Sequence, residues 1–199
     1  MTFWESATAE MRDYGIDAYL SDLNVAIDDL GGRAFLVGLC QGGWLAAAYA
    51  ARFPGKVARL VLAGAPIDPG AAESRTTQAL AAVPPAAVES LVAMIGGRTS
   101  GALSLAPWSQ SVEDEYSAEA AVQCAGDSAL NQRFDTWNTR TVDLRGAYFL
   151  QVVEWLFREN RLARGCFPAL GRRARLSDIE APMFVLAAAE DEIVACRRR

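Results

Sequence analysis

The chain has 199 residues, which is long enough for one domain with a substantial core. Hydrophobic residues make up 52% and charged residues 22%, a composition typical of a globular protein. The formal net charge of −5 argues against nucleic acid as a partner, because phosphate binding requires a basic surface. No apolar run approaches the roughly 20 residues of a membrane-spanning helix. The first residues also lack the basic-then-apolar order of a signal peptide, so the sequence predicts a cytoplasmic protein.

The hydrophobic pattern predicts alternating helices and strands up to residue 63. Apolar residues at helical spacing predict a helix over 16–30, which two glycines end. A short buried strand over 34–37, an alanine-rich helix over 44–52 and an apolar strand over 60–63 follow. The residues expected on the buried face of the first helix are Ile16, Leu20, Leu23, Ile27 and Leu30. Short connections between these elements favour parallel strands with crossover helices, an α/β architecture.

A long insertion separates this region from a last apolar strand. Two helices are predicted in it, over 80–95 and 146–159, and no clear strand. A third buried strand is predicted over 183–188, after Ala181-Pro182, in the same sheet. The predicted division is an α/β core of residues 1–65 and 182–199 with a helical cap insertion of residues 66–181.

The four cysteines and the absence of histidine limit the possible chemistry. The cysteines are Cys40, Cys124, Cys166 and Cys196. None forms a CxxC pair and there is no histidine, so a zinc site is not expected. No metal site and no cofactor are predicted. A disulfide framework is not expected in a cytoplasmic protein of this size. Most such cysteines are small buried residues, and only Cys40 stands in a sequence that suggests more.

Cys40 lies where the first strand passes into a helix, in the sequence FLVGLCQGGW. The pattern G-x-C-x-G is typical of the nucleophile elbow of α/β hydrolases, in which backbone crowding requires small residues at positions such as Gly38 and Gly42. The helix start favours the thiolate of Cys40, and the N–H of Gln41 would donate to an oxyanion. The alternatives are a packing cysteine in a glycine-rich turn or a dinucleotide-binding loop, but G-x-G-x-x-G is absent.

A catalytic acid is expected after a later strand of the sheet. Asp191 is the best candidate, because it lies in an acidic cluster just past the third strand. A solvated acidic turn is the alternative interpretation of that cluster. Asp68, which follows the second strand, is a rival position for the acid.

Taken in chain order, these segments resemble the polyhydroxyalkanoate synthases and their α/β-hydrolase relatives, which use a cysteine in a lipase-like box. Besides the box, residues 134–144 look like the family's cap segment, which carries an aromatic-Trp-Asn sequence. Residues 160–162 and 176–182 resemble its run into the last strand, and residues 190–194 resemble its acidic motif. The resemblance spans nearly the whole chain.

The resemblance implies acyl transfer between thioesters and esters. Cys40 would take an acyl group from a hydroxyacyl-coenzyme A and build a polyester on it. Asp191 would orient a histidine or help to activate the incoming hydroxyl. The resemblance also allows association with a polyester granule, and a homodimer or a partner subunit.

The sequence departs from the family pattern after Asp191. The family commonly continues with His-Ile-Val-Pro, whereas this chain has Glu192-Ile193-Val194-Ala195, and the histidine that would act as base is missing. We therefore expect a chain truncated at both ends, with negligible turnover. The alternatives are a cysteine-dependent ester or thioester hydrolase, such as a polyester depolymerase, and a non-catalytic partner subunit of the same fold.

Overall fold

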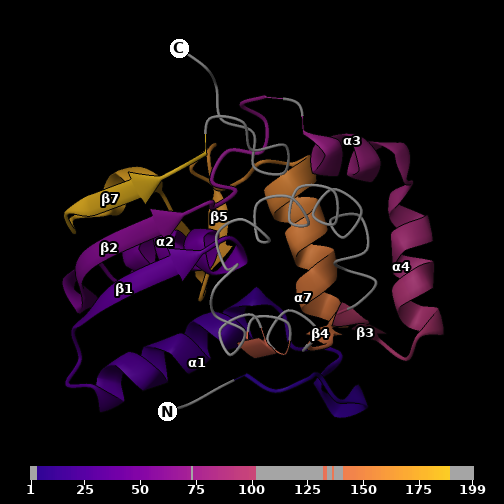
Figure 1. The fold of residues 1–199 in the computed structure, drawn as a ribbon, viewed down its shortest axis with the longest axis horizontal. Helices are drawn as coiled ribbons and strands as arrows, with labels where there is room; N and C mark the ends of the chain where they lie inside the picture. The colour runs from indigo at the N-terminus through magenta and orange to yellow at the C-terminus, as the bar shows by residue number, and fades with distance from the viewer. Residues whose placement is uncertain (1–3, 73, 102–131, 134–135, 137–140, 189–199) are drawn as a thin grey trace.

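A parallel sheet forms one side of the molecule in Figure 1. The computed structural model describes residues 4–72, 74–101, 132–133, 136 and 141–188. The sheet is formed by β1 (Ala34–Leu39), β2 (Val57–Ala63) and β7 (Met183–Leu186), in the order β1-β2-β7, with both pairings parallel. The prediction of three parallel strands in one sheet is therefore confirmed, although β1 and β2 are longer than predicted.

One helix precedes β1 in the chain and another follows it. Helix α1 (Ile16–Asp29) buries Ile16, Leu20 and Ile27, as its spacing predicts. Leu30 was expected on the same face but is 74% exposed, because the helix ends one residue before it. Helix α2 (Gln41–Arg52) begins three residues earlier than predicted and lies behind the sheet in Figure 1.

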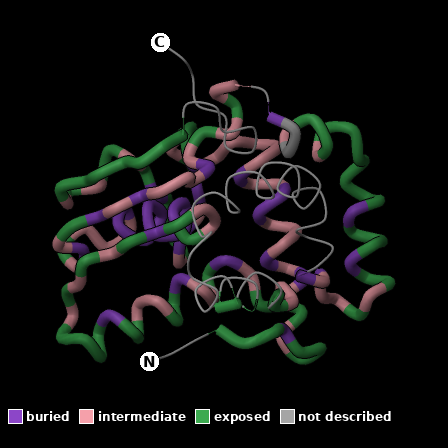
Figure 2. The backbone as a smooth tube through the Cα atoms, in the orientation of Figure 1, coloured by how far each residue is buried: buried purple, intermediate pink, exposed green. Residues whose placement is uncertain are grey.

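One face of the sheet is covered at β1 and β2, whereas β7 is exposed along its whole length. Leu60 and Leu62 of β2 are buried on the side of α2. Phe35 and Val37 of β1 point to the other side and are exposed, as is Phe184, which pairs in register with Val61. Figure 2 shows the contrast between the buried α2 and the exposed β1 and β7.

The helix predicted over 80–95 is two helices in the structure, α3 (Arg75–Ala82) and α4 (Pro85–Met94). The break falls at Pro84-Pro85, because proline lacks an N–H and disfavours helical backbone in the residue before it. Pro85 is tolerated because it stands in the first turn of α4, where its N–H would have no acceptor. Ser74 caps α3 by accepting from the Thr77 N–H.

The prediction that the insertion lacks strands is wrong. The short antiparallel pairs are β3 (Arg98–Thr99) with β4 (Leu144–Arg145) and β5 (Phe167–Ala169) with β6 (Arg172–Ala174). Strands of two or three residues are too short for alternation to appear in the sequence. The β5-β6 hairpin turns at Leu170 and Gly171, which both have positive φ, as tight hairpin turns require.

The insertion contains one continuous helical segment at the position predicted, 146–159. It begins as α7 (Gly146–Gln151) and continues as the π-helix η3 (Val152–Arg158). In Figure 1, α7 lies beyond the carboxyl ends of the strands, with α3 and α4 farther out. The remaining short elements of the described residues are the 3-10 turns η1 (Ala9–Met11), η2 (Pro54–Lys56) and η4 (Leu176–Asp178).

A hydrophobic core among the described residues joins the sheet layer to the insertion. Its largest fully buried side chains are Trp44, Tyr49, Phe167, Ile16, Leu20, Ile27, Leu60, Leu62, Leu156, Leu162 and Val57. The division into a core and a cap stays a prediction. Among the residues that the structure describes, every helix is too short or too polar to cross a membrane.

Candidate active site

Cys40 alone makes the turn between β1 and α2. Its φ is 50° and its ψ is −116°, a backbone conformation that residues other than glycine rarely adopt. The turn is fixed at both ends, because the Cys40 N–H donates to the Ala63 carbonyl at 2.8 Å and the Cys40 carbonyl accepts from the Gly43 N–H at 2.9 Å. The Cys40 side chain is half-buried. Strain of this kind is stored mainly at functional sites.

The glycines around Cys40 differ in the space they leave. A Cβ added at Gly38 would lie 2.5 Å from the Gly42 carbonyl oxygen and from the Gly43 Cα. A Cβ added at Gly42 would meet nothing within 4 Å, whereas one at Gly43 would collide with Ala65. The crowding expected at Gly42 therefore falls at Gly43. The close approach of strand and helix that a sharp turn requires depends on Gly38 and Gly43.

Gln41 is the first residue of α2, and its side chain is held from two elements. The first N–H groups of a helix have no acceptor within the helix, so the Gln41 N–H is suited to an external anion. Its side-chain Oε1 accepts from Trp44 Nε1 at 3.3 Å and from Tyr148 Oη at 3.3 Å. Trp44 follows on α2, whereas Tyr148 comes from α7.

Tyr148 lies close to this turn and stays protonated. Burial, with smaller contributions from the neighbouring Tyr19 and Cys40, raises the pKa of Tyr148 well above its usual range. The neutral phenol keeps its proton, so its hydroxyl can act as a hydrogen-bond donor.

Comparison with known proteins identifies the family. The family model described as the alpha/beta hydrolase fold matches residues 4–195. The chain belongs to the alpha/beta hydrolase family. No curated protein matches the chain. The predicted fold class, a partial α/β-hydrolase fold, is thereby confirmed, and family membership indicates hydrolase or acyltransferase chemistry in general.

Of the two candidate acids of this α/β hydrolase, the structure describes Asp68 but not Asp191. Asp191 lies outside the described residues, so its expected approach to within roughly 10 Å of Cys40 stays a prediction. Asp68 is exposed on the loop after β2, and its Oδ1 accepts from Asn160 Nδ2 at 2.6 Å. Asp68 thus ties that loop to the end of η3. In the described part of the chain, no group of three or more histidine, cysteine or carboxylate side chains could hold a metal ion.

An open cleft of about 750 Å³ lies between α3 and the end of η3 in the α/β hydrolase. It is lined by Pro69, Gly70, Ala72, Thr77, Leu80, Ala81, Ala82, Val83, Pro84, Pro85, Phe157 and Arg158. Most of these side chains are apolar. One side of the cleft is formed by the loop that follows β2. Ala63, the last residue of β2, accepts a hydrogen bond from the Cys40 N–H.

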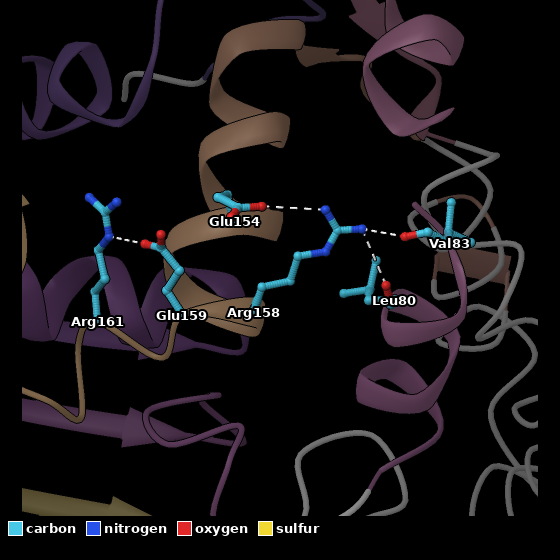
Figure 3. A network of polar contacts seen from close by, with 6 residues as sticks. All are labelled: Leu80, Val83, Glu154, Arg158, Glu159 and Arg161. Atoms are coloured by element: carbon cyan, nitrogen blue, oxygen red, sulfur yellow. Dashed lines mark hydrogen bonds and ion pairs between the residues drawn. The ribbon is translucent and has the colours of Figure 1, made fainter. Parts of the chain in front are cut away.

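Arg158 lines this cleft, and its polar contacts are drawn in Figure 3. Its guanidinium donates to the Leu80 carbonyl at 3.3 Å and to the Val83 carbonyl at 2.5 Å, and it pairs with Glu154 at 3.3 Å. The last carbonyls of a helix lack donors within the helix, so Arg158 supplies donors at the end of α3. Arg161 forms a separate ion pair with Glu159.

Tyr148 and Trp44 were not among the predicted site residues. Both lie in predicted helices, but nothing in the local pattern separates them from ordinary core aromatics. Tyr148 meets Gln41 across 107 positions of sequence, so only the packing of α7 against α2 brings them together.

Proposed function

We propose that this α/β hydrolase transfers acyl groups from hydroxyacyl thioesters, with Cys40 as the nucleophile, in the way that its resemblance to polyhydroxyalkanoate synthases implies. The observation that carries the proposal is the strained backbone of Cys40 at the junction of β1 and α2. This is the geometry in which α/β hydrolases present their nucleophile at the end of the sheet. A packing cysteine would have no need of it.

In the first half of the reaction, the Cys40 thiolate attacks the carbonyl carbon of the thioester. The carbonyl oxygen becomes an oxyanion, to which the Gln41 N–H donates. When the tetrahedral intermediate collapses, the bond to the coenzyme A sulfur breaks, and the leaving thiolate takes up a proton. The acyl group is then carried on Cys40 as a new thioester.

In the second half, the hydroxyl of another hydroxyacyl group or of a growing polyester attacks the Cys40 thioester. An ester bond forms, the Cys40 thiolate leaves, and the hydroxyl proton passes to a base. The chain contains no histidine, so no imidazole of its own can take that proton. Asp191 is the carboxylate that we assign to assist this step. We therefore expect the first half-reaction to outrun the second.

Single-turnover acylation tests the proposal. The protein is mixed with a short hydroxyacyl thioester, and the thiol released and the acyl group bound to protein are measured, the latter by mass spectrometry of peptides. We expect a burst of about one acyl group per chain on Cys40, followed by slow turnover. Cys40→Ala should lose the burst, and Cys166→Ala, which removes an exposed cysteine, should keep it.

The same experiment separates the alternatives. Release of free hydroxy acid with no transfer to an added alcohol would identify a hydrolase. A folded protein in which Cys40 is neither acylated nor alkylated by iodoacetamide faster than Cys166 would contradict the proposal and favour a non-catalytic subunit.

A further inference from the structure

We infer that Tyr148 is a positioning residue for acyl transfer, which holds the Gln41 backbone N–H in place through the Gln41 side chain. The inference rests on the proposed function of Cys40. The inference gives helix α7, through Tyr148, a role at the turn between β1 and α2. No sequence motif links α7 to that turn.

The direction of the contacts at Gln41 is fixed by their donors. An indole nitrogen can only donate, so the Gln41 atom that faces Trp44 Nε1 is the carboxamide oxygen. That oxygen accepts from Trp44 and from Tyr148, both at 3.3 Å, which uses both of its lone pairs. The Gln41 side chain is therefore anchored at its far end to α2 and to α7.

The Tyr148 hydroxyl is itself held in place. Tyr148 is 6% exposed, and its ring packs against Tyr19 with centroids 4.3 Å apart and stacks on Trp44 at 6.2 Å. The guanidinium of Arg145 lies over the ring of Tyr19, 4.4 Å from its centroid. A ring confined in this way leaves its hydroxyl little freedom, and a buried hydroxyl requires a partner. Gln41 Oε1 is that partner.

The anchor acts on the peptide that would bind the oxyanion. The N–H of Gln41 belongs to the peptide plane between Cys40 and Gln41, and that plane turns when ψ of Cys40 changes. The observed ψ of −116° belongs to a strained residue, and strain persists only where the surroundings hold it. A Gln41 side chain tied to Tyr148 opposes rotation of this plane.

The test compares two reactions of the same sulfur. Attack on a thioester develops an oxyanion, whereas alkylation by iodoacetamide develops none at the Gln41 N–H. We expect Tyr148→Phe to slow single-turnover acylation of Cys40 by about 10- to 100-fold, less than or comparable to complete loss of one oxyanion donor, about 10²–10³. The alkylation rate of Cys40 should stay within about twofold, and the thioester concentration at half-saturation should not change.

Two further variants make the test specific. Tyr19→Phe removes a hydroxyl from the same aromatic cluster without touching Gln41, and it should acylate like the wild type. Gln41→Ala keeps the backbone N–H and removes the contacts with both Trp44 and Tyr148, so it should slow acylation at least as much as Tyr148→Phe, and it tests the anchor even if that variant folds poorly. The double variant should be no slower than Gln41→Ala alone, because Gln41→Ala already lacks the contact with Tyr148.

The outcomes separate this inference from the proposed function. If the wild type is acylated and Tyr148→Phe is acylated at the same rate, the positioning role of Tyr148 is overturned. The proposed role of Cys40 as nucleophile is then unaffected. Parallel loss of acylation and alkylation, or additive effects in the double variant, would also overturn it, because they indicate general damage or an independent role. Absence of acylation in the wild type would contradict the proposed function itself.

Discussion

Glycine at position 40 should give a more stable protein than alanine at the same position. Cys40 has a φ of 50°, where a Cβ clashes with the backbone and glycine does not. Both Cys40→Gly and Cys40→Ala remove the sulfur, so the comparison between them isolates the strain that the Cβ causes. In an ordinary helix the order is reversed, because glycine is less favourable than alanine by about 1 kcal/mol.

The expected difference follows from two opposing terms. A residue in such a conformation carries about 1–3 kcal/mol of strain, which glycine removes. Glycine in turn makes the unfolded chain more flexible, which lowers stability by about 0.4–1 kcal/mol. The net effect is about 1 kcal/mol in favour of glycine. For a chain of this length, that difference raises the melting temperature by roughly 2–4 °C.

Thermal and urea unfolding of the two variants would measure this difference. Ala26, exposed on α1, offers the control, because Ala26→Gly places the same pair of residues in a regular helix and should lower stability by about 1 kcal/mol. If glycine at position 40 destabilised the protein relative to alanine by the amount seen at Ala26, Cys40 would not be strained. The observation that carries the proposed nucleophile would then be lost.

Two other predictions concern the elbow glycines and a buried tyrosine. Gly38→Ala should destabilise the protein by about 1–3 kcal/mol and slow Cys40 alkylation, because its Cβ would lie 2.5 Å from the backbone of Gly42 and Gly43. Gly42→Ala, with nothing within 4 Å, should stay within about 0.5 kcal/mol of wild type, and equal losses in both variants would contradict the geometry. Burial, followed by the charge of Asp28, raises the pKa of Tyr49 to about 12 from the ordinary 10.0. The stability from this shift is complete below pH 10 and disappears as the pH rises to about 12, and a spectroscopic titration that Tyr49→Phe does not alter would refute this assignment.

The parallel sheet could be predicted because its signals are local. Each strand is an apolar run near a glycine or proline, and helical spacing marks α1 before the first of them. The insertion was harder to predict for a physical reason. The β5-β6 pair packs against α2, and the π-helix continuation of α7 packs against α3, so neither is marked by a periodic pattern in its own sequence. The break between α3 and α4 is different, because Pro84-Pro85 already marks it in the sequence.

The site was predictable only where one short segment contains it. Cys40, Gln41 and Gly38 lie within four positions, and the elbow pattern predicts their arrangement. The partner of Gln41 comes from a helix more than a hundred residues away, so no spacing rule could assign Tyr148. The tight contact of Gly43 with Ala65 was missed for the same reason, because it depends on how closely α2 passes the loop after β2.

The strain at Cys40 also bears on the alternative of a non-catalytic subunit. Folded proteins are stable by only about 5–15 kcal/mol, so a strained residue uses a noticeable part of that margin. A subunit that only binds a partner would gain stability from glycine at this position. Instead the chain keeps a cysteine there, with glycine at the crowded positions 38 and 43 and a tether from Tyr148 to Gln41 that opposes relaxation. Packing alone does not explain these features together, whereas the proposed nucleophile beside an oxyanion donor accounts for all of them. We therefore favour a chemical role for Cys40, in which the missing imidazole limits the release of the acyl group rather than its capture.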